Sequence, residues 1–459
     1  MAAPVAARRY PNLMTCELVH KYAAPVPRYT SYPTAPNFTA EVTRDDYARW
    51  LSQLPDNAPL SLYAHIPFCD TLCWYCGCNT KQVRRYSPVA AYLPALLKEI
   101  CNVAALVPGR AKVAHVHWGG GSPNILAGDD ILKLADAMRG NFAFADDMEF
   151  AVEIDPRRLE ADRVSAFARA GLTRVSLGVQ DFAQKVQDAI NRQQPFEVTK
   201  RAVERFRAAG VGSVNLDLVY GLPHQTERSV LETIDLALQL KPDRIALFGY
   251  AHLPSKLPHQ RMIADSSLPG PLQRFAQANQ VAARLLQNGY VRVGLDHFAL
   301  PHDSLASGNV QRNFQGYTTD KAETLIGFGA SAIGHLPQGY VQNAVPSADY
   351  ARRVESHGLA TARGVELSCE DRLRASLIER LMCDLTFDPG ELAERFGDVM
   401  VAPVLQEAAE LVAADSDGLI EAADDGFTIT EKGRPFVRTI CAHFDAYLGT
   451  SPAKHAMGV

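Results

Sequence analysis

Residues 61–78 read SLYAHIPFCDTLCWYCGC and place a dense group of cysteines directly after a short run that predicts a β-strand. The group has the spacing C-x3-C-x2-C-x-C, whereas the other five of the nine cysteines are scattered singly. Its members are Cys69, Cys73, Cys76 and Cys78. Thiolates at this density favour zinc, Cu(I) or an iron–sulfur cluster over inert buried thiols.

The absence of a second ligand pair in the sequence argues against zinc. A structural zinc site usually draws two ligand pairs from separated segments, and the chain holds no second Cys pair or Cys/His pair. We therefore interpret the cysteine loop as an iron–sulfur site and keep a zinc-stabilised scaffold as the alternative.

The order of strand, polar loop and helix repeats from residue 60 to residue 250. The predicted strands are Ser61–Pro67, Val113–Trp118, Met148–Ile154, Arg174–Val179, Ser213–Val219 and Arg244–Gly249. The predicted helices between them are Ala90–Val103, Asp129–Arg139, Asp162–Ala170, Val198–Ala209 and Glu227–Leu240. Successive βα units predict a parallel sheet. Because a full eight-stranded barrel needs about 250 residues, the fold class is α/β with a partial (β/α)6 parallel barrel.

Polar side chains end several of these strands. Glu153 and Asp155 end the third strand, Gln180 and Asp181 the fourth, and Asp217 the fifth. A single acid at a strand end is most often a helix cap or a solvated loop residue. Because the carboxyl ends of parallel strands form one edge, several such residues together predict one composite active site that also includes the cysteine loop.

The spacing C-x3-C-x2-C, with an aromatic residue before the third cysteine, resembles the signature of the radical S-adenosylmethionine superfamily. In that superfamily three cysteines hold three irons of a [4Fe–4S] cluster, and the fourth iron is open to the amino and carboxylate groups of S-adenosylmethionine. The resemblance implies one such cluster on Cys69, Cys73 and Cys76. It also implies a partial barrel of the radical SAM type.

A longer series of motifs is similar to one family of that superfamily, the oxygen-independent coproporphyrinogen III dehydrogenases. The motifs are PRYTSYPT, YAHIPFCDTLCWYCGCN, HWGGGSP, VEIDP, GVQDF, NLDLVYGLP, YAHLP, LDHFA and RNFQGYTT. The resemblance extends from near residue 20 to the C-terminus.

This family resemblance also implies roles for individual residues. The residues implied to contact the cluster-bound S-adenosylmethionine are Tyr63, Gly120, Glu153 and Ile333. Those implied to contact a second S-adenosylmethionine are Tyr75, Gly121, Ser122, Gln180, Arg192, Asp217 and Ala251. We assign catalytic roles to Tyr63, His65, Cys78 and Arg192. The family usually has Thr at the position of Ser122, so the hydroxyl is kept there. It often has Phe at the position of Tyr75, where this chain therefore carries an additional hydroxyl.

The implied activity is an anaerobic oxidative decarboxylation in haem biosynthesis. A 5′-deoxyadenosyl radical takes hydrogen from the β-carbon of a propionate, and loss of CO2 and one electron leaves a vinyl group. Two of the four propionates of coproporphyrinogen III react, giving protoporphyrinogen IX. The implied partners are an electron donor such as flavodoxin or ferredoxin and an unknown terminal electron acceptor.

A substrate with four propionates needs cationic and hydroxyl donors around its site. Their concentration in two matched motifs outside the barrel makes the following our hypothesis for that rim: Arg28, Tyr29, Tyr32, Arg312 and Gln315. The alternatives are a haem chaperone and a haem-degrading relative of the same superfamily. Chaperone relatives commonly lack the fourth cysteine and the PRYTSYPT arm, both of which are present here.

We divide the chain into an N-terminal arm (1–55) that contacts the substrate site, a catalytic domain (56–360) and a small C-terminal domain (361–459). The turn formers in PRYTSYPTAPNF predict no regular element over that segment. The mostly helical, winged-helix-like tail is predicted to contain helices over Cys369–Cys383, Asp388–Phe396 and Ala402–Ala413, a hairpin turning at Asp425-Gly426, and a last helix over Glu431–Leu448.

Composition and charge limit the possible partners. The 459 residues carry 46 Lys and Arg against 51 Asp and Glu, a formal charge of −5. The tail holds 9 basic against 18 acidic residues, which disfavours phosphate binding despite its winged-helix-like order. No apolar run is long enough to span a membrane. We expect a cytoplasmic protein that binds neither nucleic acid nor membrane, and the charge balance permits a monomer.

Overall fold

The computed structural model describes residues 13–423 and 426–449. Its centre is a parallel sheet formed by the six predicted strands, each in the predicted place. They are β1 (Pro59–Ile66), β4 (Lys112–Gly120), β5 (Ala143–Ile154), β6 (Arg174–Gln180), β7 (Ser213–Tyr220) and β8 (Arg244–Gly249). Leu62 lies opposite Val116 and Leu216 opposite Ile245, and the register shifts at a bulge between Gly178 and Gln180 of β6.

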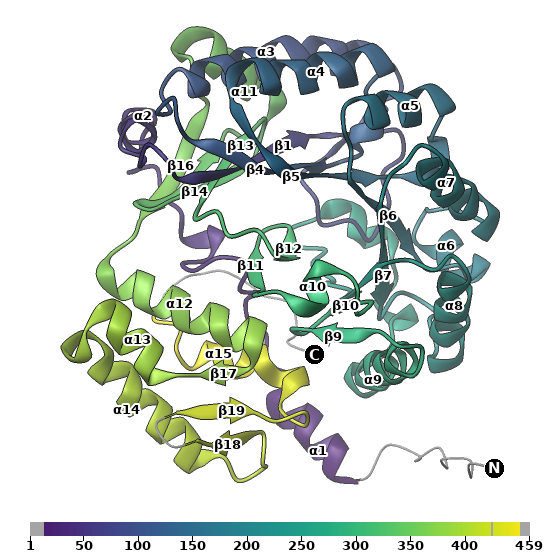
Figure 1. Cartoon of the computed structure of the whole chain (residues 1–459). Helices are drawn as coiled ribbons and strands as arrows, with labels where there is room; N and C mark the ends of the chain where they lie inside the picture. The colour runs from purple at the N-terminus through teal and green to yellow at the C-terminus, as the bar shows by residue number, and fades with distance from the viewer. Residues whose placement is uncertain (1–12, 424–425, 450–459) are drawn as a thin grey trace.

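Helices cover the outer face of this curved sheet (Figure 1). They are α3 (Ser87–Ala104), α4 (Gly128–Asn141), α5 (Ala161–Arg169), α6 (Gln184–Ala189), α7 (Phe196–Ala208), α8 (Glu227–Gln239), α9 (Pro271–Gln287) and α11 (Ser347–His357). Apolar residues of the strands and helices form one large core that includes Trp118, Phe167 and Phe206. The α/β partial barrel predicted from the βα repeats is confirmed.

The sheet is larger than six strands, because it is extended at both edges to twelve. On one side β13 (Thr324–Phe328) pairs parallel to β1, followed by β14 (Ile333–Leu336), β15 (Gly339–Asn343) and β16 (Thr361–Glu366). On the other side β10 (His297–Ala299) and β9 (Val291–Val293) follow β8. We expected the C-terminal domain to begin at residue 361, which is where β16 begins. Because β16 pairs with β15, this strand belongs to the large sheet.

Several short elements lie near the strand ends. They are β2 (Phe68–Cys69), β3 (Lys81–Gln82), β11 (Gln311–Asn313), β12 (Gly316–Thr318), α10 (Ser304–Ser307) and the 3-10 turns η2 (Pro123–Ile125), η3 (Pro156–Arg158), η4 (Pro258–Met262) and η5 (Asp265–Ser267). Figure 1 shows β11 and β12 beside the open side of the barrel.

The N-terminal arm contains two helices on either side of the turn-rich segment. They are α1 (Leu13–Tyr22) and α2 (Arg44–Ser52), and between them η1 (Ala35–Asn37) is the one short turn. The arm crosses the molecule, because Leu18 and Val19 pack in the core of the C-terminal part, whereas Trp50 packs in the core of the barrel.

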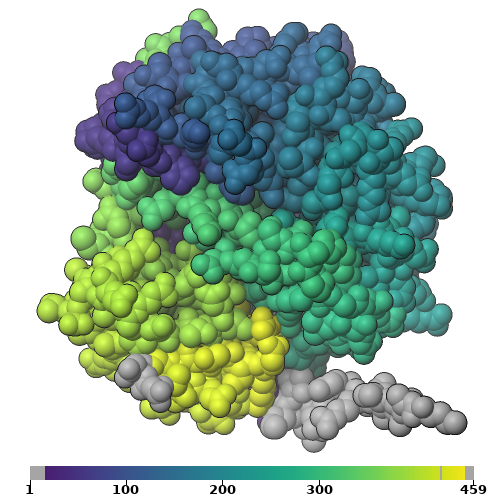
Figure 2. All heavy atoms as spheres, in the orientation of Figure 1, coloured from purple at the N-terminus to yellow at the C-terminus, as the bar shows by residue number. Residues whose placement is uncertain are grey.

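The C-terminal part has its own apolar core and lies beside the barrel (Figure 2). Its elements are α12 (Cys369–Asp384), β17 (Thr386–Phe387), α13 (Pro389–Phe396), α14 (Asp398–Ala414), β18 (Ile420–Ala422), β19 (Phe427–Ile429), η6 (Arg434–Phe436) and α15 (Val437–Ala442). The predicted hairpin is confirmed, with Ala422 opposite Phe427, although Asp425 of its turn lies outside the described residues.

The last predicted helix is wrong in extent. The structure has η6 followed by the single short helix α15 instead of one helix over 431–448. Pro435 has no N–H to donate, and the chain turns beyond Ala442 so that the ring of Phe444 is fully buried. Arg374 holds that turn by donating to the carbonyl of Phe444 at 3.0 Å.

No helix in residues 13–423 or 426–449 has the length and apolar character needed to cross a membrane.

Candidate active site

The four clustered cysteines lie on one loop beyond the carboxyl end of β1. The loop is closed at its base by β2 and β3, in which Phe68 pairs with Lys81 and Cys69 with Gln82. Within it, the N–H of Cys76 donates to the carbonyl of Cys73 at 3.2 Å. The N–H of Cys78 donates to Sγ of Cys76 at 3.4 Å. Together with a bond from the Cys78 thiol, this lowers the pKa of Cys76 to about 6.

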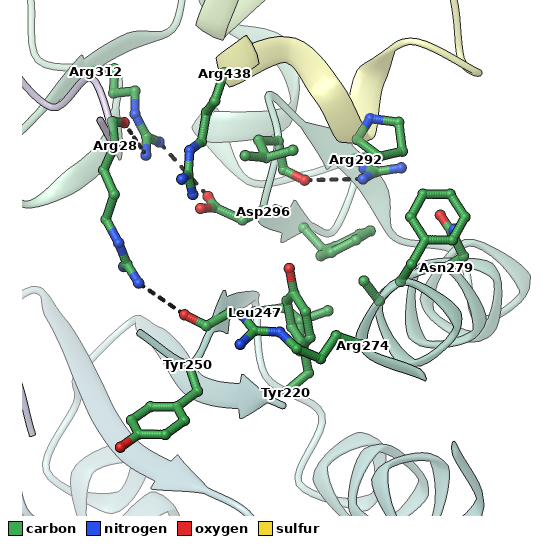
Figure 3. A pocket seen from close by; sticks show the side chains of 16 residues that line it. Arg28, Tyr220, Leu247, Tyr250, Arg274, Asn279, Arg292, Asp296, Arg312 and Arg438 are labelled. Atoms are coloured by element: carbon green, nitrogen blue, oxygen red, sulfur yellow. Dashed lines mark hydrogen bonds and ion pairs between the residues drawn. The ribbon is translucent and has the colours of Figure 1, made fainter. Parts of the chain in front are cut away.

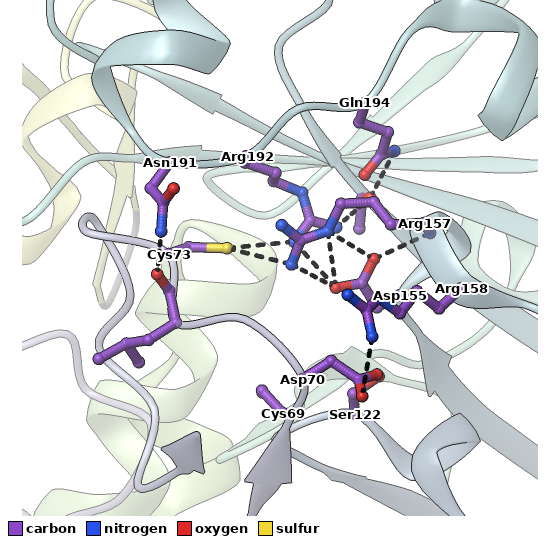
Figure 4. A network of polar contacts seen from close by, with 12 residues as sticks. Cys69, Asp70, Cys73, Ser122, Asp155, Arg157, Arg158, Asn191, Arg192 and Gln194 are labelled. Atoms are coloured by element: carbon purple, nitrogen blue, oxygen red, sulfur yellow. Dashed lines mark hydrogen bonds and ion pairs between the residues drawn. The ribbon is translucent and has the colours of Figure 1, made fainter. Parts of the chain in front are cut away.

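Cys73 lies against a buried cationic network (Figure 4). Arg157 and Arg192 donate to its Sγ at 3.4 and 3.5 Å, and both guanidinium groups pair with Asp155, at 2.6 and 3.5 Å. Burial raises the pKa of Asp155, but Arg192 and Arg157 outweigh it and lower that pKa to about 2. The network therefore combines two cations with one anion beside the sulfur of Cys73.

These residues suit an iron–sulfur cluster. All nine cysteines are unpaired, so three thiols on one loop are available as ligands. Within residues 13–423 and 426–449, no three His, Cys, Asp or Glu side chains converge on a single metal ion. A [4Fe–4S] cluster does not require this, because each of its thiolates binds a different iron. The N–H donor to Cys76 and the cations at Cys73 supply the hydrogen bonds to sulfur that tune such clusters.

The glycine triplet follows β4 next to the cysteine loop, and each glycine is there for a steric reason. A Cβ on Gly119 would lie 2.7 Å from the carboxyl group of Glu153, and one on Gly120 would lie 2.5 Å from the ring of His65. A Cβ on Gly121 would lie 2.4 Å from the carbonyl oxygen of Phe68. The triplet therefore lets the backbone of the β4 loop touch both the cysteine loop and β5.

Tyr63, His65 and Glu153 surround this glycine loop. The hydroxyl of Tyr63 hydrogen-bonds Nδ1 of His65 at 3.0 Å, and Nε2 of His65 lies 2.9 Å from the carbonyl of Asn79 in the cysteine loop. Glu153 accepts from the N–H of Gly120 at 3.2 Å and from His117 at 3.1 Å. Burial raises the pKa of Glu153, but the bond from His117 outweighs it, and the net shift is downward.

Gln180, Arg192 and Asp217 lie at the next strand ends. Gln180 has a φ of 70°, a left-handed conformation at a β-bulge. Its side-chain amide and the guanidinium of Arg192 both flank Gly178, and Arg192 donates to the Gly178 carbonyl at 2.7 Å. Burial raises the pKa of Asp217, which accepts from Ser176 at 2.7 Å. The nearby carboxylate of Glu153 raises the pKa of Asp217 further, because a neighbouring negative charge disfavours ionisation.

The remaining predicted cofactor residues connect the cysteine loop to its neighbours. Gln260 donates from Nε2 to the carbonyls of Tyr75 and Ala251, at 3.0 and 3.1 Å, so these two residues lie side by side. The N–H of Ser122 donates to the carbonyl of Phe68 at 2.9 Å. Ile333 begins β14 on the other side of β1.

Asp181 does not belong to this group. Its side chain is fully buried and accepts from the N–H of Ala183 at 2.6 Å, from Gln225 at 2.6 Å and from Thr233 at 3.1 Å. Asp181 therefore ties the loop after β6 to α8, and the expectation that it faces the site is wrong.

The structure separates the five residues of the rim hypothesis. Arg28 and Arg312 line an open pocket between β8, α9, the arm and α15. Tyr29 and Tyr32 instead are buried in the core of the C-terminal part, where Tyr29 donates to Asp445 and Tyr32 accepts from the N–H of Ala446. Gln315 lies in the turn between β11 and β12.

Sequence reasoning missed His117, Arg157 and Gln260. His117 is the first residue of the HWGGGSP motif, and Arg157 follows the VEIDP motif directly, so their positions in or beside matched motifs were a usable signal. Gln260 lies in η4, outside the quoted motifs, and only the folded loop brings it to Tyr75.

Comparison with known proteins places this geometry in a family. Residues 63–237 match the Radical SAM superfamily model, and residues 367–436 match the HemN C-terminal domain model. The oxygen-independent coproporphyrinogen III oxidase of Bradyrhizobium diazoefficiens is 49% identical over 95% of this chain and 97% of its own length. The protein of that name from Escherichia coli is 40% identical over 94% of this chain and 95% of its own.

A solved structure agrees with these sequence matches. The structure described as coproporphyrinogen III oxidase (HemN) from Escherichia coli, a radical SAM enzyme, has a TM-score of 0.87 at 39% identity and covers 92% of this chain and 97% of that one. The superfamily implies a [4Fe–4S] cluster and S-adenosylmethionine. The chain therefore belongs to the oxygen-independent coproporphyrinogen III oxidases, a family of radical S-adenosylmethionine enzymes.

Proposed function

We propose that this chain converts two propionates of coproporphyrinogen III to vinyl groups without oxygen and so forms protoporphyrinogen IX in haem biosynthesis. One observation carries the proposal. The cysteine loop, the glycine loop and the polar strand ends share one edge of a parallel sheet, in a chain 49% identical over 95% of its length to a protein named for this activity.

Three cysteines are our candidates for binding the cluster: Cys69, Cys73 and Cys76. When bound, the cluster and S-adenosylmethionine supply one electron and a carbon-centred radical. The chain keeps the loop in place through hydrogen bonds at its sulfurs, with Thr80 at 3.2 Å from Sγ of Cys69 and Arg157 at 3.4 Å from Sγ of Cys73.

We assign the first S-adenosylmethionine to Tyr63, Gly120, Glu153 and Ile333. The support is geometric, because the N–H of Gly120 donates to Glu153 at 3.2 Å and Glu153 presents a carboxylate held in the ionised form. A carboxylate is the natural acceptor for the ammonium group of this ligand. His65 positions this corner by packing against Gly120 while it bonds Tyr63 and the loop carbonyl of Asn79.

We assign a second S-adenosylmethionine to the neighbouring set Tyr75, Gly121, Ser122, Gln180, Arg192, Asp217 and Ala251. Arg192 supplies a guanidinium for a carboxylate, and Asp217 supplies an acceptor. The left-handed conformation of Gln180 supports a binding role, since such strain concentrates at ligand sites.

Tyr63, His65, Cys78 and Arg192 are our candidates for catalysis. They surround the cysteine loop, where closely packed side chains can exclude water and oxygen from a radical. Cys78 is the exposed member of the loop, and its N–H bonds Sγ of Cys76. We assign it to tuning or protecting the loop.

We place the reaction in the cytoplasm, because nine unpaired cysteines suit a reducing compartment. The proposed partners are a low-potential donor such as flavodoxin or ferredoxin and a terminal electron acceptor. We also propose a monomer, which the formal charge of −5 permits. We also keep the arm (1–55), the catalytic domain (56–360) and the C-terminal domain (361–459) as proposed functional units.

The test is anaerobic turnover of the iron-reconstituted full chain with coproporphyrinogen III, S-adenosylmethionine, a low-potential reductant and cell extract as acceptor, with products separated by liquid chromatography and mass spectrometry. We expect a product with two vinyl groups, and its loss in Cys69→Ala. The matched control is Cys101→Ala, an exposed cysteine of α3, which should retain turnover.

Two other results would replace this function. Cleavage of S-adenosylmethionine without a vinyl product, together with tight haem binding, would favour the haem chaperone. Opening of bound haem would favour the haem-degrading relative.

A further inference from the structure

The open pocket beside β8 is lined by an unusual number of arginines (Figure 3). It lies where β7, β8, β9 and α9 meet the arm and α15, and its empty volume is about 800 Å³ including its open mouth. The arginines that line it are Arg28, Arg274, Arg292, Arg312 and Arg438.

The described residues supply little negative charge to this pocket. Among the lining residues that the structure describes, Asp296 is the one acid, and it lies 3.8 Å from Arg312 and 2.8 Å from His297. Burial raises the pKa of Asp296, but Arg312 and His297 outweigh it and keep that pKa well below its usual value. The described lining therefore contains five arginines and one acid, an excess of positive charge among these side chains.

The guanidinium groups are held in place by rings and carbonyls more than by acids. Arg312 lies 4.4 Å from the ring of Tyr317, and Arg274 lies 5.9 Å from that of Tyr220. Arg292 donates to the carbonyl of Leu295 at 3.1 Å. The buried Nε atoms of Arg274, Arg292 and Arg312 have no hydrogen-bond acceptor in the described chain. Rings and a carbonyl therefore orient Arg274 and Arg292, whereas Arg312 also pairs with Asp296.

The arrangement is costly for the free protein. Burial and the neighbouring Arg434 lower the pKa of Arg292 to about 10. Burial and the neighbouring Arg28 lower the pKa of Arg438 to about 10 as well. Like charges gathered in a partly buried space favour binding of an anion, and guanidinium groups bind carboxylates bidentately.

We propose that this arginine pocket binds the two propionate carboxylates that the reaction leaves in place. The inference rests on the proposed function and specifies where its substrate is held. A tetrapyrrole with four propionates presents two neighbouring pairs of carboxylates, and one pair matches the charge excess of the pocket.

The chemistry of decarboxylation selects the spared pair. A reacting carboxylate leaves as neutral CO2, so it loses its charge on the way to the transition state. Guanidinium groups that bind the carboxylate stabilise the starting state more than that transition state and therefore slow the reaction. A pocket with five arginines therefore suits propionate carboxylates that the reaction does not remove.

The position of the pocket agrees with this. Among the described residues, its lining includes neither the cluster cysteines nor the glycine triplet. It does include Gly249 and Tyr250, which directly precede Ala251 of the candidate cofactor site. A ligand anchored here by one edge therefore extends toward the cofactor side with its other edge.

The arm and the C-terminal part complete the pocket. Arg438 donates to the carbonyls of Pro27 and Val26 at 3.1 and 3.0 Å, and the next residue, Arg28, extends to the carbonyl of Gly249 at 2.9 Å. Substrate held by these side chains would connect three parts of the chain that are far apart in sequence.

The test is a fluorescence titration of the full chain with two stable porphyrins. Coproporphyrin III has four propionates, and mesoporphyrin IX has two, on the rings that keep them in the reaction. We expect wild-type protein to bind both with affinities within about tenfold of each other. Arg274→Gln and Arg292→Gln should each weaken both by about tenfold or more, since each removes a charged hydrogen-bond donor.

Controls separate the pocket from folding and from turnover. Arg228→Gln changes an exposed arginine of α8 and should leave both affinities unchanged. Arg274→Lys keeps the charge and should retain part of the binding that Arg274→Gln loses, which a folding defect would not explain. In turnover, the glutamine variants should release more of the three-propionate, monovinyl intermediate than wild-type protein does.

Two outcomes would overturn the inference. In the first, mesoporphyrin IX binds far more weakly than coproporphyrin III and is insensitive to the arginine variants, so the pocket holds the reacting pair. In the second, neither porphyrin is affected by the variants, so carboxylates bind elsewhere. Absence of vinyl product from wild-type protein with arginine-dependent binding intact would contradict the proposed function but not the pocket.

Discussion

The ring of His65 occupies the space that a side chain at Gly120 would need, because a Cβ on Gly120 would lie 2.5 Å from Cε1 of the imidazole. Gly120 also has a φ of 105°, a conformation that L residues rarely adopt. The glycine loop and the strand that carries Tyr63 are therefore fitted to each other at this point.

Gly120→Ala is expected to lower the free energy of unfolding by about 1–3 kcal/mol and to abolish cleavage of S-adenosylmethionine. The clash with His65 and the positive φ act together. Denaturant unfolding and an anaerobic cleavage assay measure the two effects. Gly140→Ala is the matched control, because nothing lies within 4 Å of its added Cβ, and it should retain activity. Full activity of the Gly120→Ala protein would contradict the fit described here.

Asp155→Asn is expected to destabilise the cluster-free protein by about 2–3 kcal/mol at pH 7, because it leaves Arg157 and Arg192 without their shared carboxylate. The pKa of Asp155 is about 2 in the folded chain, against a usual value of 3.8. Its contribution is therefore complete above pH 3.8 and is lost as the pH falls through 2.

Unfolding free energies of both proteins across this acidic range provide the measurement. The difference between wild type and Asp155→Asn should narrow as the pH falls below about 4. A difference that stays constant across the range would show that Asp155 does not act through its charge. Asp162→Asn, in the first turn of α5, is the control for a general effect of removing an acid.

The sequence predicted the six central strands because their side chains are buried on both faces, as at the adjacent residues Ile245 and Ala246 of β8. It missed β13, where Gly327 interrupts the apolar pattern. That glycine is needed because a Cβ there would lie 2.6 Å from the carbonyl oxygen of Ile333. Periodicity does not reveal such close backbone contacts, so strands that contain them look like loops.

The candidate site also contains some residues that the sequence predicted and others that it did not. The matched motifs directed attention to Glu153 and Arg192, which do lie beside the glycine and cysteine loops. Tyr29 and Tyr32 stand in an equally distinctive motif but are buried in the C-terminal core, since a tyrosine suits a core as well as a rim. The arginines of the pocket come from distant elements, and only tertiary structure brings Arg274 to its partners.

Glu99 is expected to make stability fall as the pH rises from about 5 to 8. It is 1% exposed, and burial raises its pKa from 4.5 to about 7 in spite of bonds from the N–H of Gly329, Tyr350 and Asn343. Between these two pKa values the folded chain binds a proton that the unfolded chain has released. This costs about 3 kcal/mol by pH 8.

Glu99→Gln should remove this pH dependence. We expect the change in unfolding free energy between pH 5 and pH 8 to be smaller than in wild type by about 3 kcal/mol. Glu355→Gln, at a 78% exposed side chain of α11, should leave the dependence as it is. Comparing each protein with itself at two pH values removes any constant cost of the substitution. Parallel curves for wild type and Glu99→Gln would contradict the buried, protonated carboxyl.

Gln180→Gly is expected to raise the stability of the fold and to weaken ligand binding. Gln180 adopts a φ of 70°, so glycine should relieve about 1 kcal/mol of backbone strain. The same change removes the amide that flanks Gly178 beside Arg192, so the stoichiometry of S-adenosylmethionine on the reconstituted protein should fall from two toward one.

Lys241→Gly is the control, because Lys241 has a φ of 48° at an exposed turn after α8 and should gain stability with no change in binding. Equilibrium dialysis with thermal unfolding gives both readouts. A Gln180→Gly protein that still binds two molecules would show that the left-handed residue shapes the bulge between β6 and β7 without contacting the second ligand.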